Sequence, residues 1–134
     1  MFRNSRTIKA LGTALLGSLI LLNTQAHAAR CSIAGPIEIR QTNGFTIFCQ
    51  LTRTGIDLGG FCTSGNVQGS VSGVLERSGR MNMKVRWGKG EAIGVYTAFA
   101  AANGELVDGR TFDQRNPKSS ARWTSPRRLK CRPR

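Results

Sequence analysis

The sequence predicts an all-β fold: an antiparallel meander of seven to eight strands closed into a small barrel and held by two disulfides. Three observations indicate this class. Apolar and polar residues alternate in short runs along most of the chain after residue 35, as in strands with one buried face. Glycine-containing turn signals recur about every 8–12 residues and separate these runs. No run has the periodicity of a helix of about ten residues. A β-sandwich is the alternative, but its crossed connections need longer links than these tight turns provide.

The first 28 residues have the three-part pattern of a secretory signal peptide. Three basic residues precede a 13-residue uncharged stretch, residues 10–22, and Ala26 and Ala28 supply the small residues of a cleavage site after Ala28. Thirteen residues are too few for a membrane span, which needs about 20. We therefore expect residues 29–134 to form one exported domain, periplasmic or secreted, with no transmembrane segment.

The charge and the histidine content limit the chemistry of that domain. The chain has 20 Lys and Arg residues against 7 Asp and Glu, and its single histidine is His27. Loss of the signal leaves 17 basic and 7 acidic residues, a net charge of +10, and no histidine. Ser-His and Cys-His catalysis and His-ligated metals are therefore excluded for the exported domain. Asp108 and Asp113 would lie on opposite faces of a regular strand, so they form no obvious acid–base pair. We expect no catalytic residue, no metal and no cofactor.

Four cysteines lie in the exported part: Cys31, Cys49, Cys62 and Cys131. An even number of cysteines in a small exported domain indicates two disulfides. A metal site is disfavoured because the chain has no C-x-x-C spacing and no histidine after residue 27. Four cysteines allow three pairings. We favour Cys31 with Cys131, which joins the two ends, and Cys49 with Cys62, which closes a local loop.

The first predicted hairpin joins residues 36–42 to residues 45–51 through Asn43-Gly44, the strongest short hairpin signal. A two-residue turn at this point would place Glu38 opposite Cys49, with Cys49 and its alternate neighbours on one face. Residues 53–60 contain three glycines and are expected to form a loop.

The middle of the chain predicts three further strands. Residues 67–75 alternate, with Gly69 and Gly73 on the inward face, where a missing side chain indicates a bend or a closely approaching strand. Residues 81–87 give the clearest alternation, and their inward set is Met81, Met83, Val85 and Trp87. The next strand has Tyr96 on the side opposite its predicted inward set, which is Ile93, Val95, Thr97 and Phe99.

Two strands complete the predicted meander. Residues 106–113 follow the turn signal Asn103-Gly104, and residues 121–125 follow Asn116-Pro117. Residues 125–134 contain two prolines and lie outside the strand pattern. We expect Cys131 to hold this last segment against the domain.

From residue 67 to residue 125, the succession of short alternating strands, with Trp87 and Trp123 near strand ends, resembles the up-and-down barrels of the calycin type. The avidin-like secreted proteins are the members nearest in size. The resemblance covers about half of the exported chain at the level of strand rhythm, and it matches no binding residue of that family. It implies a barrel and leaves the ligand open.

Aromatic side chains are the first candidate site. Trp87, Tyr96 and Trp123 could contact a small apolar ligand in the barrel, and Trp87 is favoured because it ends a strand beside the turn at residues 88–90. The same aromatics could instead be core, because an eight-stranded barrel is just wide enough to be filled by its own side chains. The sequence thus predicts a non-enzymatic exported barrel that binds a small apolar ligand or a protein partner.

The basic C-terminal segment, residues 122–134, is the second candidate site. It contains no acidic residue and six basic ones: Arg122, Arg127, Arg128, Lys130, Arg132 and Arg134. Such a cluster attracts anionic glycans, lipid head groups or phosphates, so an envelope-associated anion binder is the alternative function. A solvated basic tail explains the same residues. Intracellular nucleic acid is disfavoured by the predicted export and by the shortage of aromatic residues between the charges.

Overall fold

The computed structural model describes residues 31–33, 36–90 and 92–131; the predicted signal peptide lies outside these residues. The described residues form ten β-strands and no helix. Eight of the strands make a closed antiparallel barrel in chain order, and the other two pair with each other. The predicted class, an all-β meander closed into a barrel with two disulfides, is therefore confirmed, and the sandwich alternative is excluded.

The barrel strands are β2 (Pro36–Gln41), β3 (Thr46–Thr54), β4 (Asp57–Ser64), β5 (Val67–Leu75), β6 (Arg80–Trp87), β7 (Ala92–Ala100), β8 (Leu106–Asp113) and β9 (Asn116–Thr124). The short pair consists of β1 (Cys31–Ser32) and β10 (Lys130–Cys131). Each barrel strand pairs with its neighbour in the chain, and β9 returns to β2. This closing seam has only two residue pairs, Arg40 with Thr124 and Gln41 with Trp123.

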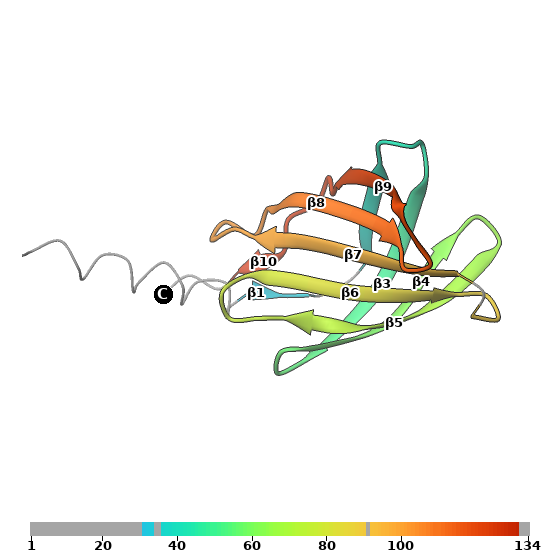
Figure 1. The fold of residues 1–134 in the computed structure, drawn as a ribbon. Coiled ribbons are helices and arrows are strands. Elements are labelled where there is room, and N and C mark those ends of the chain that lie inside the picture. The colour runs from blue at the N-terminus through green and yellow to red at the C-terminus, as the bar shows by residue number, and fades with distance from the viewer. Residues whose placement is uncertain (1–30, 34–35, 91, 132–134) are drawn as a thin grey trace, which may run out of the picture.

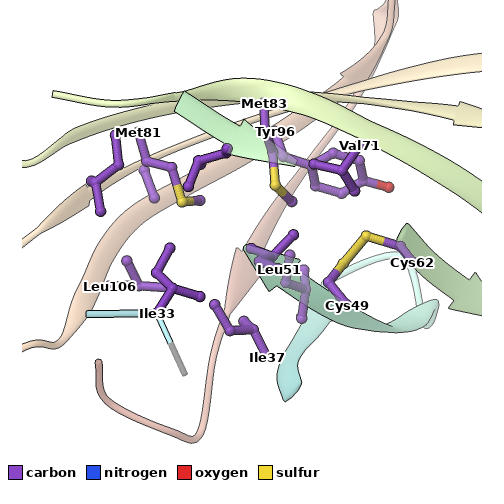
Figure 2. Close-up of a cluster of buried hydrophobic side chains, with 14 of the residues drawn as sticks. Ile33, Ile37, Cys49, Leu51, Cys62, Val71, Met81, Met83, Tyr96 and Leu106 are labelled. Atoms are coloured by element: carbon purple, nitrogen blue, oxygen red, sulfur yellow. A yellow bond between two sulfur atoms is a disulfide. The ribbon is translucent and has the colours of Figure 1, made fainter. Parts of the chain in front are cut away.

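The core is the barrel interior, filled by alternate side chains of each strand. On β6, Met81, Met83 and Val85 are at most 1% exposed, as their alternation predicted. Gly73 on β5 faces this row, and a Cβ atom there would lie 2.6 Å from the Cα atom of Met83. The predicted close approach of strands is therefore present at Gly73. In Figure 2, Met81 lies toward one end of the core cluster and Tyr96 toward the other.

The predicted register of the first hairpin is wrong by one residue. Glu38 pairs with Phe48, and Ile37 pairs with Cys49. The turn contains three residues, 42–44, as shown by the hydrogen bond that the Gln41 amide donates to the Phe45 carbonyl across it (2.8 Å). The side chain of Cys49 nevertheless points inward, so the face assignment of this strand holds.

The loop predicted for residues 53–60 is also wrong, because a strand begins inside it. β3 continues to Thr54 and β4 starts at Asp57, which leaves a turn of two residues. Gly55 in that turn has φ +64°, a left-handed conformation that favours glycine. Gly60 allows the β3 backbone to approach, since a Cβ atom there would lie 3.2 Å from the Cα atom of Leu51. The glycines of this segment therefore serve a hairpin instead of a loop.

The inward face predicted for β7 is wrong as well. Tyr96 pairs with Met83 and Ala98 pairs with Met81, so Tyr96 and Ala98 share the interior with the β6 methionines. Phe99, predicted to point inward, is 43% exposed. Residues directly opposite each other on neighbouring strands point to the same face of the sheet, so the pairing with Met81 and Met83 selects the inward side of β7.

β9 begins at Asn116, five residues before its predicted start. Pro117 is tolerated because it lies within the register shift between β8 and β9, and β2 pairs only with Trp123 and Thr124. The last described residues then cross to β1, where Cys31 and Cys131 form a disulfide. The second disulfide joins Cys49 to Cys62 inside the barrel. Both favoured pairings are therefore confirmed.

The two ends of the barrel differ. The paired strands β1 and β10 lie at one end, on the left in Figure 1, and Leu129, at 7% exposure, belongs to the core there. The Arg53 guanidinium fastens this end, since it donates to the carbonyl of Cys31 (2.7 Å) and to that of Leu75 (3.0 Å). The turns at residues 42–45 and 88–90 lie at the opposite end, which has no such cover among the described residues.

Candidate functional site

A pocket of about 160 Å³ opens at the end of the barrel opposite β1 and β10. We call it the mouth pocket. Five segments contribute to it: the end of β2 with the turn that follows, the end of β6, the start of β7, the end of β8 and the first half of β9. The lining residues are Gln41, Asn43, Trp87, Ala92, Ile93, Gly94, Tyr96, Thr111, Phe112, Asp113, Ser119 and Ala121.

Tyr96 is the polar centre of the mouth pocket. Its side chain is 4% exposed, and its hydroxyl accepts a hydrogen bond from Gln41 Nε2 (3.3 Å). Burial raises the pKa of the Tyr96 phenol above its usual value, and hydrogen bonds with the side chains of Thr111, Gln41 and Trp87 offset part of that rise. The phenol is therefore protonated at neutral pH and can both donate and accept a hydrogen bond.

Trp87 stands beside Tyr96 because Gly94 leaves space between them. A Cβ atom at Gly94 would lie 3.2 Å from the Tyr96 hydroxyl and 3.3 Å from Trp87 Nε1. The indole ends β6, and the following turn is closed by a hydrogen bond from the Gly90 amide to the Trp87 carbonyl (2.9 Å). Two of the three predicted ligand contacts, Trp87 and Tyr96, are thus brought together at one pocket.

Trp123, the third predicted contact, lies elsewhere. It is 3% exposed and does not line the mouth pocket. Its Nε1 donates to the carbonyl of Arg110 (2.9 Å), and its ring packs over Gly109, where a Cβ atom would lie 2.9 Å from the indole Cε2. In the structure Trp123 locks β8 against β9 within the core.

The predicted anion-binding residues do not share one recess. Arg122 lies on β9 opposite Arg110 of β8, and both are exposed. Arg127, Arg128 and Lys130 line a separate recess of about 180 Å³ near β1. Arg132 and Arg134 lie outside the described residues.

Sequence reasoning missed Gln41 and Thr111, which complete the hydrogen bonding of Tyr96. Gln41 reaches Tyr96 across 55 positions of the chain, so no local pattern connects them. Thr111, which is 6% exposed, had no signal in the sequence either, because only the β7–β8 register places it opposite Tyr96. The buried Tyr96 hydroxyl needs hydrogen-bond partners, and the pairing of β7 with β8 supplies Thr111 as one of them.

Within the described part of the chain, no group of three or more His, Cys, Asp or Glu side chains could hold a metal ion. The carboxylate in the mouth pocket, Asp113, accepts a hydrogen bond from the backbone amide of Arg115 (2.9 Å). No helix among the described residues is long and apolar enough to cross a membrane.

No family model, curated protein or solved structure matches this chain. The resemblance to calycin-type barrels therefore stays a prediction.

Proposed function

We propose that the protein is an exported, non-enzymatic barrel that binds a compact ring-shaped ligand in the mouth pocket. The observation that carries this proposal is the convergence of an indole, Trp87, and a buried phenol, Tyr96, on one opening of the barrel. Ligand sites combine apolar or aromatic walls with a few polar groups that set orientation, and this pocket supplies both.

The volume and lining restrict the ligand. A protein cavity of about 150 Å³ is large enough to hold benzene, so the space of about 160 Å³ suits a single ring with small substituents. Gln41, Thr111 and Ser119 add polar groups around the aromatic pair. This lining favours a ring that carries a hydroxyl or amide group over the purely apolar ligand suggested by the aromatic residues alone.

A binding role suits the titration of Tyr96. The raised pKa keeps the phenol protonated at neutral pH, which suits a hydrogen-bond partner and disfavours a general base. Export is supported by the predicted signal peptide and by the two disulfides, since disulfides persist mainly in oxidising compartments. A periplasmic or secreted location is therefore part of the proposal.

The two tryptophans of the chain allow a direct test. In a Trp123→Phe variant, Trp87 is the sole indole and reports on the mouth pocket alone. We expect phenol and nicotinamide to change its fluorescence in a saturable way, and toluene to do so more weakly. Native mass spectrometry of the protein recovered from its own compartment would then identify a retained ligand.

A matched pair of glutamine variants supplies the control. Gln41→Ala removes a hydrogen bond to Tyr96, whereas Gln50→Ala removes an exposed side chain on the outer face of β3. Binding should weaken with the first change and remain with the second. The proposal fails if no single-ring compound binds, or if both variants bind equally well; a co-purifying protein without a small ligand would favour the protein-partner hypothesis.

A further inference from the structure

A second hollow lies on the outer wall of the barrel, where the turn after β2 meets β9. This groove has a volume of about 510 Å³ and contains no carboxylate among its lining residues, which are Thr42, Thr97, Arg110, Thr111, Phe112, Ser120, Ala121 and Arg122. We call it the seam groove. Its polar lining consists of two guanidinium groups and several hydroxyl groups.

The two arginines are directly opposite each other in the β8–β9 register, so their side chains leave the same face of the sheet. Both are exposed, and neither guanidinium makes an ion pair or hydrogen bond with another described residue. The single ion pair among the described residues joins Arg40 to Glu38 (2.7 Å). Like charges placed directly opposite across strands repel. An anion bound between Arg110 and Arg122 would relieve that repulsion.

The backbone beneath both arginines is held in place. The Arg110 carbonyl accepts the Trp123 indole hydrogen bond (2.9 Å). On the neighbouring strand, the Arg122 amide donates to Thr42 Oγ1 (3.1 Å), and the Thr42 amide donates to the Arg122 carbonyl (2.8 Å). The two guanidinium groups therefore extend from fixed positions, which lowers the ordering cost of binding.

The chemistry of the groove favours a phosphate ester. A guanidinium presents paired N–H donors that match the oxygens of phosphate, and such charge-assisted bonds are among the strongest that side chains make. The hydroxyls of Thr42, Thr97 and Ser120 can donate to or accept from a hydroxylated group beside the phosphate. The volume lies within the range of small-molecule sites, about 300–1,000 Å³, so a bare ion would leave most of it empty.

We propose that the seam groove binds a phosphate ester carried on a hydroxylated body, as in a sugar phosphate or a glycerol-phosphate head group. Arg110 and Arg122 hold the phosphate between them, and the three hydroxyl side chains contact the body. The seam groove and the mouth pocket are separate hollows, although Thr111, Phe112 and Ala121 border both. With the C-terminal cluster predicted from the sequence, the groove shares only Arg122.

Isothermal titration calorimetry at low ionic strength tests the groove. We expect glucose phosphate to bind more tightly than inorganic phosphate, and uncharged glucose not to bind. Arg110→Gln and Arg122→Gln should each weaken binding by about tenfold or more. Arg80→Gln on β6 is the matched control, because it removes the same charge from an exposed position outside the groove; it should change the affinity by less than about twofold.

Vesicles of phosphatidylglycerol, compared with phosphatidylcholine, distinguish a lipid head group from a soluble ester. Binding of glucose phosphate or of phosphatidylglycerol vesicles supports the proposal if it depends on Arg110 and Arg122. It is overturned if neither glucose phosphate nor the vesicles bind, or if Arg80→Gln weakens binding as much as the groove variants do, which would indicate attraction by net charge alone.

The indoles separate this proposal from the mouth pocket. In a Trp87→Phe variant, the remaining Trp123 is hydrogen-bonded to the Arg110 backbone, and glucose phosphate should change its fluorescence. The same compound should leave Trp87 unaffected in the Trp123→Phe variant. Failure of either site therefore leaves the test of the other site intact.

Discussion

Removal of the Cys31–Cys131 disulfide should destabilise the whole domain and not only its covered end. The disulfide closes a loop with a sequence separation of 100 residues. In the chain-entropy model, a loop of this length contributes about 4.7 kcal/mol by restricting the unfolded chain. Domains of this kind have free energies of unfolding of about 5–15 kcal/mol. The Cys31→Ala/Cys131→Ala double variant should therefore lose a third or more of its stability.

The measurement is urea unfolding of the double variant and the parent protein, followed by tryptophan fluorescence. We expect a loss of about 4–5 kcal/mol in the free energy of unfolding, with the transition still cooperative. The Cys49→Ala/Cys62→Ala variant provides the comparison. Its loop has a sequence separation of 13, which corresponds to about 3 kcal/mol of chain entropy. Removal of two fully buried cysteine side chains destabilises this variant further.

The reasoning requires β1 and β10 to unfold together with the barrel. If the end segment instead frays while the barrel persists, the long disulfide restricts little of the unfolded chain. The Cys31→Ala/Cys131→Ala variant would then lose less than about 2 kcal/mol, and hydrogen exchange would become fast at Leu129 alone while Met83 stayed protected. That result would refute the estimate. The contacts that oppose it are the buried Leu129 side chain and the two hydrogen bonds of Arg53.

Two further predictions follow from single residues. Tyr96 is the only tyrosine in the chain, so tyrosinate absorbance reports on this residue alone. Because burial raises the pKa of Tyr96, its phenol should titrate at a higher pH in the native protein than in denaturant, where the pKa is about 10. Stability from this phenol is accordingly complete below about pH 10 and is lost as the pH rises through the raised pKa; equal midpoints in the native and unfolded protein would contradict this. Gly73→Ala should cost about 1–3 kcal/mol in urea unfolding, because its Cβ atom would collide with the Asn82 carbonyl. Gly59→Ala, which meets only ordinary contacts, should be nearly neutral, and equal losses would exclude the collision as the cause.

The class of fold could be predicted because β6 has a single apolar face. Met81 and Met83 alternate with charged or polar neighbours, so the period of two identifies both the strand and its buried side. β7 offered no such signal, since both of its faces contain apolar residues. There the register with β6, and not the hydrophobicity of Val95 or Phe99, selects the inward side. Pairing between strands is tertiary information that a local pattern does not contain.

The candidate sites were predictable to the same limited extent. Trp87 was identified because it ends a clear strand beside a glycine turn. Arg110 could not be paired with Arg122, because their alignment depends on an irregularity between β8 and β9. The register shifts between Phe112, which pairs with Ser120, and Asp113, which pairs with Asn116. The extra residues on β9 change every opposition beyond that point.

The short seam between β2 and β9 explains why both hollows lie in the same region. β2 contributes only its last two residues to the closing ladder, so the first half of β9 has no second neighbour among the described strands. The Thr42 turn crosses this gap and bonds to Arg122, which leaves the seam groove outside the wall. On the inner side, the same gap brings Gln41 to Tyr96 and leaves the mouth pocket open. The pair Thr111 and Ala121 borders both hollows, so a barrel closed along the full length of β9 would have neither.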